Sequence, residues 1–192
     1  MKCRLLLVAG SVAAVAAFPA GADGVPGGAV MVDDEDDVSN VLDLERVTMT
    51  ESRNGRYRVE VITWERWSVS DLVASSGPSG SVCVRLWTTR QPSSRPPNYL
   101  VCATPDADGE KLVGQVLRDS GTSVPTKVAS ATVSGPDTRR RLAFAFTATS
   151  IREPSKVRFG VEAAQASGCP RPRGCIDTAP DAPASRGFEP RG

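Results

Sequence analysis

Alternation of apolar side chains with polar or small ones is the feature that most restricts how this chain folds. It is clearest in four segments, at residues 57–61, 82–86, 142–146 and 157–161. A repeat of two residues places successive side chains on opposite faces of an extended backbone, so it is typical of β-strands with one buried face. These segments therefore predict four strands that cover a common core.

Four further strands are expected where the alternation is weaker, at residues 42–50, 99–104, 112–118 and 127–134. In the first of these segments the apolar parity changes between Leu44 and Val47, which predicts a β-bulge near Glu45 and Arg46. The only helical structure that we expect is a turn or two within residues 67–75.

Turn-forming residues separate the expected strands, as at Asn54-Gly55 and at residues 106–109. Gly, Asn, Asp and Pro favour tight turns because of their backbone preferences and their short polar side chains. Eight short strands separated in this way predict an all-β fold, a jelly-roll-like antiparallel β-sandwich of about eight or nine strands.

Residues 1–22 have the pattern of a secretory signal peptide. Lys2 and Arg4 precede an apolar run at residues 5–18, and small residues follow it up to a cleavage site after Ala22. The mature protein is therefore predicted to be secreted and extracellular. No later apolar segment approaches the roughly 20 residues that a membrane helix needs, so no membrane span is expected in the mature protein.

The mature chain is expected to form one domain with irregular ends. The predicted division is a signal peptide at 1–22, an acidic flexible leader at 23–39, the β-sandwich at 40–167 and a Pro-, Arg- and Gly-rich tail with a small disulfide loop at 168–192. Because the tail has no periodicity, we expect it to be extended and partly disordered.

The mature chain is also nearly neutral. The signal peptide holds two of the 23 Lys and Arg residues and none of the 22 Asp and Glu residues, so the mature formal charge is −1. This balance gives no electrostatic reason to expect nucleic acid or an anionic membrane as a partner.

Four cysteines remain once Cys3 leaves with the signal peptide. An even number in an exported chain predicts two disulfides, for which three connectivities exist. We favour Cys83 with Cys102, across a predicted hairpin, and Cys169 with Cys175, which closes a short loop.

The hairpin register supports the first of these pairings. With those two cysteines opposite each other, Val84 faces Val101 and Leu86 faces Tyr99. A shift by one residue would turn all of these apolar side chains outward, so the disulfide and the apolar pattern predict the same register.

Histidine is absent from the whole chain. Its absence removes the usual general base near neutral pH, the Ser-His-Asp triad and every His-ligated metal centre. We therefore predict that the protein is not an enzyme. A pair of carboxylates for glycoside hydrolysis stays open, since its criterion is a separation in space rather than in sequence.

The acidic segment before the first expected strand supplies the candidate metal ligands, which are Asp33, Asp34, Asp36, Asp37 and Asp43. Carboxylate oxygens are the ligands that calcium prefers. A solvated acidic leader explains the same composition and is the favoured interpretation. We predict no cofactor, with calcium as the alternative.

Two tryptophans are the predicted binding residues. Trp64 shares the outward parity of Glu60, and Trp87 shares that of Arg85, whereas Trp67 has the parity of the core. Flat indole rings on an outer face suit stacking on a sugar ring or an apolar partner surface. The alternative is that a loop or the tail covers them, because large aromatic side chains are usually mostly buried.

Several segments together carry a resemblance to a known kind of protein. These are the acidic leader, residues 42–47, the strand at 57–67 with its W-x-x-W ending, residues 99–101, and the closing segment 175–181. They resemble uncharacterised secreted proteins of actinobacterial type, whose strand plan is similar to the DOMON and family-9 carbohydrate-binding-module sandwiches. The resemblance covers roughly residues 33–181 and implies a ligand-binding sandwich, with sugar as the ligand.

Haem is not expected from this resemblance. DOMON domains that bind haem use His or Met ligands, and only Met31 and Met49 remain after cleavage. Of these two, Met49 has the parity of the core.

The predicted function is a secreted, non-catalytic binding module for carbohydrate or cell-wall polymer. The alternative is a protein-interaction or inhibitor-type module that uses a rigid loop, either residues 92–97 or the loop between Cys169 and Cys175. A carboxylate-based hydrolase is the third hypothesis. The expected partner is an extracellular glycan or protein.

Overall fold

The computed structural model describes residues 29–88, 95–121, 124–135, 139–166, 175–181 and 184–190, so the predicted signal peptide lies outside the described residues. Two short 3-10 helices occur, η1 (Val69–Leu72) and η2 (Ala148–Ile151). The strands are β1 (Val30–Asp33), β2 (Leu44–Glu51), β3 (Arg56–Trp67), β4 (Ser81–Trp87), β5 (Tyr99–Pro105), β6 (Leu112–Arg118), β7 (Thr126–Ser134), β8 (Arg139–Thr147), β9 (Val157–Ala164), β10 (Ile176–Ala179) and β11 (Arg186–Phe188).

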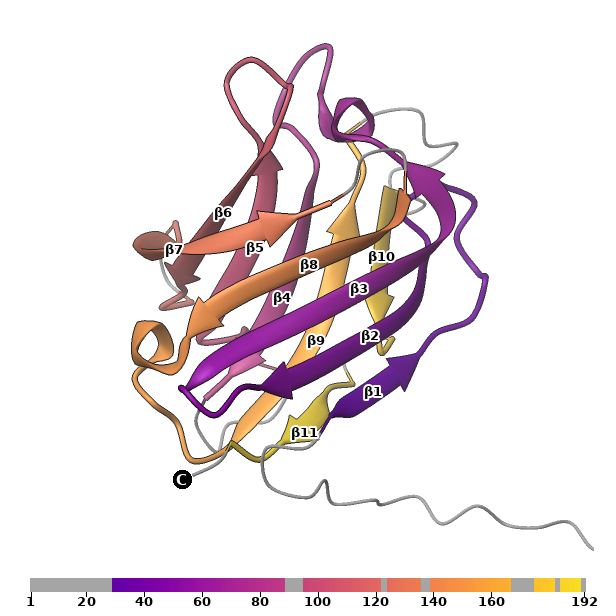
Figure 1. Ribbon diagram of the computed structural model, residues 1–192. Helices are drawn as coiled ribbons and strands as arrows, with labels where there is room; N and C mark the ends of the chain where they lie inside the picture. Colours follow the sequence, from indigo (N-terminus) through magenta and orange to yellow (C-terminus); the bar gives the residue numbers. More distant parts are fainter. Residues whose placement is uncertain are drawn as a thin grey trace, which may run out of the picture.

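The strands pair antiparallel throughout, in the order β1-β2-β3-β8-β7-β6-β5-β4-β9-β10, with β11 on β9. In Figure 1, β1, β2, β3 and β8 cross in front of a second layer that contains β6, β5, β4, β9 and β10. The all-β antiparallel prediction is confirmed.

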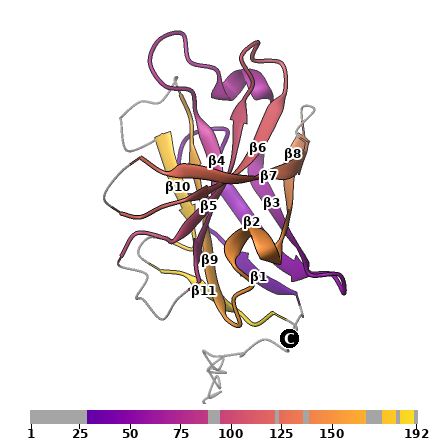
Figure 2. The same ribbon diagram turned by 90° about the vertical axis from the view of Figure 1, so that its left-hand side faces the viewer.

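One strand joins the two layers. The first part of β7 pairs with β6 and its last residues, 132–134, pair with β8. Figure 2 shows β7 crossing from one layer to the other. On the opposite side β11 contacts β1, so the two layers approach a closed barrel.

All eight strands expected from the alternation are present. The predicted bulge is confirmed by a register shift between Leu44 and Arg46 in the β2–β3 pairing. The short helix η1 falls within residues 67–75, as expected. The expectation that no other segment is helical is wrong, because η2 forms after β8. The structure adds three strands to the eight expected segments, so the described residues form eleven strands, more than the eight or nine predicted.

One added strand lies within the predicted acidic leader. Val30 and Val32 of β1 are each 9% exposed, and they pair with Met49 and Val47 of β2. The expectation that residues 23–39 form a leader outside the fold is therefore wrong at residues 30–33. Two buried valines are too few to reveal the two-residue repeat of a strand in the sequence. The strand forms because β2 supplies a partner for its backbone.

The other two added strands lie in the predicted tail. Both β10 and β11 pair with β9, and Ala179 and Phe188 are buried. The sandwich boundary at residue 167 is therefore wrong, because the sheet continues to Phe188. Strands of four and three residues are too short for a sequence pattern, and β9 supplies the hydrogen bonds that hold them.

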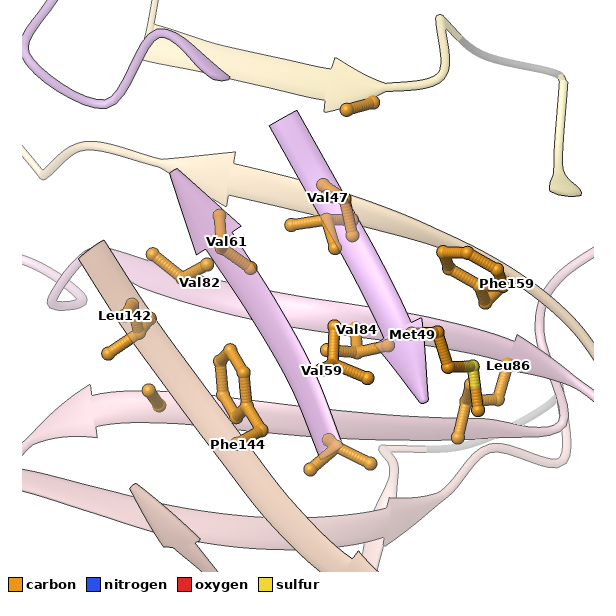
Figure 3. Packing of buried hydrophobic residues seen from close by; sticks show 14 of the residues in the cluster. Val47, Met49, Val59, Val61, Val82, Val84, Leu86, Leu142, Phe144 and Phe159 are labelled. Carbon is orange, nitrogen blue, oxygen red and sulfur yellow. The ribbon is translucent and has the colours of Figure 1, made fainter. Parts of the chain in front are cut away.

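The core lies between the two layers and consists of the alternating apolar residues. Burial of each Val, Leu or Phe side chain contributes about 1.5–3 kcal/mol. Figure 3 shows residues of β2, β3 and β8 facing residues of β4 and β9: Val47, Met49, Val59, Val61, Leu142 and Phe144 on one side, and Val82, Val84, Leu86 and Phe159 on the other.

The predicted hairpin is present in the predicted register. Cys83 pairs with Cys102 in the ladder, and a disulfide joins them with a Cα–Cα distance of 4.0 Å. Cys175 is also disulfide-bonded. Its predicted partner Cys169 lies outside the described residues, so that pairing stays a prediction. No helix in the described part of the chain is long and apolar enough to cross a membrane.

Candidate functional site

Trp87 is not available to a ligand. Its side chain has the outward parity predicted for it, but it is only 1% exposed. Its Nε1 donates a 2.9 Å hydrogen bond to the carbonyl oxygen of Arg95, and the guanidinium of Arg85 lies 5.1 Å from the ring centroid. The expected exposure of Trp87 is therefore wrong, and the alternative, that a loop covers the ring, is confirmed for this residue, with the chain at Arg95 hydrogen-bonded to the indole.

Trp64 is exposed, as predicted, with 38% of its surface accessible. It lies on β3 in the front layer, whereas Trp87 lies on β4 in the back layer. Both side chains point away from the core, so they lie on opposite faces of the sandwich. The two tryptophans do not form one binding surface.

A pocket of about 460 Å³ lies at one end of the sandwich. It forms where the β2–β3 hairpin, the connection from η2 to β9 and the segment after β11 meet, at the lower left of Figure 1. We call it the end pocket, and its lining residues are Glu51, Gly55, Tyr57, Ala148, Glu153, Pro154, Ser155 and Pro190.

Tyr57 and Ser155 are the two residues with a hydroxyl group in the described lining of the end pocket. Tyr57 lies deep in the fold. The residue is 1% exposed, and its ring packs against Phe146 at 5.4 Å and edge-on against Phe188 at 5.9 Å. Burial, followed by the negative charges of Glu51 and Glu153, raises the pKa of Tyr57 to about 12. The hydroxyl therefore stays protonated near these two carboxylates.

The backbone that presents Glu153 is strained. Arg152 and Glu153 follow each other in the left-handed region, with φ of 65° and 46°. Such a conformation costs of order 1–3 kcal/mol for each residue other than glycine, and it concentrates at functional sites. Hydrogen bonds from the Arg152 amide to Thr149 O and from the Glu153 amide to Ala148 O hold the turn, at 3.2 and 2.9 Å.

The sequence contained one overlooked signal for this pocket. Glu51 continues the inward parity of Val47 and Met49 along β2, and it is 8% exposed. A carboxylate at an inward position needs a polar environment. The end of the strand where it lies is therefore the place to expect a polar cavity.

The candidate calcium ligands are distributed over different environments. Asp33 lies outside any cluster, because Arg46 Nε donates to its Oδ1 at 2.6 Å and both side chains are exposed. Asp36 and Asp37 are exposed in the loop that follows β1. Asp43, by contrast, is 2% exposed and precedes β2 directly.

The structure adds a carboxylate from the distant end of the chain. Asp177 on β10 is 4% exposed, and it accepts hydrogen bonds from the amides of Leu44 at 2.6 Å and Thr178 at 2.7 Å. It lies near enough to Asp34 and Asp43 to raise the pKa of each. Sequence spacing gave no signal for this approach, since it depends on the packing of β10 beside β2.

Burial and mutual repulsion act on these carboxyl groups. The pKa of Asp34 is raised to about 7. Burial is the largest cause, and the negative charges of Asp177, Asp181 and Asp37 add to the rise.

The pKa of Asp43 is raised to about 7 as well. Burial is the largest cause of this rise. The hydrogen bond from the Val38 amide lowers the pKa, and interactions with Asp177 and Asp36 raise it further. The pKa of Asp177 is also raised, mainly by burial. Within the ranges that the structure describes, no group of three or more His, Cys, Asp or Glu side chains has metal-site geometry as the side chains stand.

Comparison with known proteins found no family model, no curated protein and no solved structure that matches this chain. Its function therefore has to be inferred from the geometry of its own sites.

Proposed function

We propose that the protein is an exported, non-catalytic module that binds carbohydrate in the end pocket. The observation that carries this proposal is that Glu51, Tyr57 and Glu153 line one pocket, with both carboxylates near enough to raise the pKa of Tyr57. Its volume of about 460 Å³ falls within the range of roughly 300–1,000 Å³ that is typical of small-ligand sites.

The chemistry of the lining suits a ligand rich in hydroxyl groups. Carboxylates accept hydrogen bonds from hydroxyls, while the Tyr57 hydroxyl can donate or accept. Pro154, Pro190 and Ala148 provide apolar contacts for the carbon face of a sugar ring. The resemblance to carbohydrate-binding sandwiches supports the same ligand class.

Export is part of the proposal and rests on the predicted signal peptide. The disulfide between Cys83 and Cys102 supports it, because stable disulfides accumulate in oxidising compartments. Trp64 is left out of the proposed site. It follows Tyr57 by seven residues on β3, which corresponds to about 23 Å at 3.3 Å per residue.

The experiment is a polysaccharide and glycan-array screen, followed by titration calorimetry with the best ligand. Glu51→Gln and Glu153→Gln are expected to weaken binding at least tenfold. Glu65→Gln, which changes an exposed carboxylate of β3, is the matched control and is expected to bind like wild type. Absence of glycan binding, or a loss in Trp64→Ala without a loss in the pocket variants, would overturn the proposal.

A carboxylate-based hydrolase is the second candidate. The observation that favours it is that Glu51 and Glu153 line the same pocket, since glycosidases use two carboxylates across the bond that they cleave. Release of new reducing ends from a bound polysaccharide, abolished by Glu153→Gln, would replace the binding proposal with this one. Binding without hydrolysis would remove the hydrolase.

A protein-interaction module is the third candidate, and the anchoring of one predicted loop favours it. The side-chain oxygen of Asn98 accepts a hydrogen bond from the Thr88 amide at 3.0 Å. The backbone amide of Asn98 donates one to the carbonyl oxygen of Leu86 at 2.9 Å. The base of the loop at residues 92–97 is thus fixed, although residues 89–94 and the loop between Cys169 and Cys175 lie outside the described residues. Loss of partner capture from culture supernatant on replacing residues 92–97 with Gly and Ser would support it, and unchanged capture would remove it.

A further inference from the structure

We propose that the outer face of the front layer binds an extended polysaccharide that bears carboxylate or phosphate groups. The site is formed by four arginines, which we call the arginine face: Arg46 on β2, Arg56 and Arg58 on β3, and Arg141 on β8. Figure 1 looks onto the strands that carry these residues. None of the four is among the described residues that line the end pocket, so this is a second, separate site.

The strand register places the four arginines on one surface. Ile62 of β3 is paired with Arg46 on β2 and with Arg141 on β8. Paired residues point to the same side of a sheet, and residues two apart on a strand share that side, so Arg58 and Arg56 continue the row from Ile62. Neighbouring strands lie about 4.8 Å apart, so roughly 10 Å separate the backbones of Arg46 and Arg141.

Glu60 holds two of these guanidinium groups together. Its Oε2 accepts a hydrogen bond from Nη2 of Arg141 and lies 3.7 Å from Nη2 of Arg58. The side chains of Arg58 and Arg141 are nevertheless 52% and 57% exposed. One carboxylate cannot neutralise two guanidinium groups, each with five N–H donors, so the pair presents positive charge and unused donors to solvent.

Positive charge is in excess on this face, although the predicted mature chain is nearly neutral. Asp33 and Glu60 are the carboxylates that pair with the arginine face, and they oppose two of its four charges. Arg56 is exposed and takes part in none of the ion pairs between described residues. Glu45 of β2 is paired with Arg140 and leaves the excess unchanged. The overall composition therefore does not describe the local charge that an anionic ligand meets.

The side chains on and beside the arginine face favour a carbohydrate polymer. Arginine forms paired, planar hydrogen bonds with carboxylate and phosphate groups. Thr48 and Thr50 have the same outward parity as Arg46 and add hydroxyl groups to the face. Trp64 follows Ile62 by two residues, about 7 Å along β3, and its exposed indole offers a flat surface for a sugar ring.

The test uses the full mature chain in affinity electrophoresis and titration calorimetry with polygalacturonate, a glycerol-phosphate teichoic acid and neutral dextran. We expect binding to at least one of the two anionic polymers, none to dextran, and a loss of affinity as the salt concentration increases. The polymer that binds distinguishes carboxylate from phosphate as the recognised group. Arg58→Gln with Arg141→Gln is expected to weaken binding at least tenfold, and thermal melting checks that this variant keeps its fold.

Arg118→Gln with Arg186→Gln is the matched control, because it removes the same charge from exposed positions on β6 and β11, outside the front layer. It is expected to bind like wild type. Binding to neither anionic polymer, or an equal loss of affinity in the control, would overturn the arginine face as a site. Equally tight binding of single-stranded DNA would also overturn it, by showing attraction to any polyanion. None of these outcomes bears on the end pocket, whose described lining contains none of the substituted arginines.

Discussion

The backbone amide of Leu44 donates a 2.6 Å hydrogen bond to Oδ2 of Asp177, which lies 133 positions further along the chain. Leu44 is the first residue of β2 and Asp177 belongs to β10, so this bond connects the front layer to the last part of the back layer. Both residues are buried. The C-terminal segment is therefore part of the core structure.

Replacing Asp177 with Ala is expected to destabilise the fold. The change leaves the buried Leu44 amide without an acceptor, at a cost of about 1–3 kcal/mol. Urea unfolding at pH 5 measures this loss, because Asp34 and Asp43 are largely protonated there and relief of repulsion contributes little. Asp177→Asn retains one acceptor oxygen and is expected to lose less stability than Asp177→Ala. A larger loss of stability for Asn than for Ala would contradict the role of the hydrogen bonds.

Stability is expected to fall as the pH rises from about 4 to 7. Asp34 and Asp43 have their pKa raised from 3.8 to about 7, so in this range the folded chain holds protons that the unfolded chain has released. The free energy of unfolding then decreases with pH, by roughly 1–3 kcal/mol, and the melting temperature decreases by several °C.

Thermal melts between pH 4 and pH 8 measure this decrease. Asp43→Asn removes one of the two groups and is expected to flatten the profile, whereas Asp33→Asn is expected to leave it unchanged. The prediction fails if the melting temperature of the wild-type protein rises from pH 5 to pH 7.

Phe188→Ala is expected to cost about 3–5 kcal/mol of stability, as for other fully buried aromatic residues. Phe188 is 2% exposed and contacts Tyr57 edge-on at 5.9 Å. Ile176→Ala, on the neighbouring strand β10 but 48% exposed, is the control and is expected to change stability by about 0.5 kcal/mol or less. Equal effects of the two substitutions would show that the C-terminal segment is not packed as described.

Gly114→Ala is expected to destabilise the β6–β7 pairing by roughly 1–3 kcal/mol. A Cβ at this position would clash with the carbonyl oxygen of Ala131 and lie 2.6 Å from Cγ2 of Val133. A Cβ on Gly187 of β11 would meet no atom within 4 Å, so Gly187→Ala serves as the control. Chemical denaturation compares the two, and a neutral Gly114→Ala would contradict the close approach of the strands.

Acrylamide quenching of tryptophan fluorescence is expected to find one accessible tryptophan. Trp64 is 38% exposed, while Trp67 and Trp87 are at most 2% exposed. Trp64→Phe should remove the quenchable emission, and Trp87→Phe should leave it in place. Strong quenching that persists in Trp64→Phe would show that a second indole is accessible.

The alternation in the sequence was sufficient to predict the eight longer strands. A strand such as β3 spans twelve residues, so its buried side chains repeat often enough to define the inward face. The strands β1, β10 and β11 have three or four residues each, and a period cannot be recognised over that length. Their formation depends on hydrogen bonds from β2 and β9 that are available only in the folded chain.

The candidate sites were predicted less completely, for two physical reasons. Parity showed that Trp87 points out of its sheet, but it carries no information on the chain at Arg95 that encloses the ring. Likewise, the acidic segment contained Asp34 and Asp43, whereas Asp177 approaches them only because β10 packs beside β2. Contacts between distant segments are properties of the topology rather than of local sequence.

The pairing of β7 with both layers has a consequence for how this protein behaves towards its own copies. Two separate sheets would present four unpaired borders, whereas the continuous path of the described strands ends at β1 and β10, each four residues long, with the three-residue β11 off this path on β9. Unpaired backbone is what a strand from another molecule needs for templated growth of a sheet, and very short borders give it little to bind. The short strands at the ends of the path therefore limit the backbone that is available for fibril-like self-association.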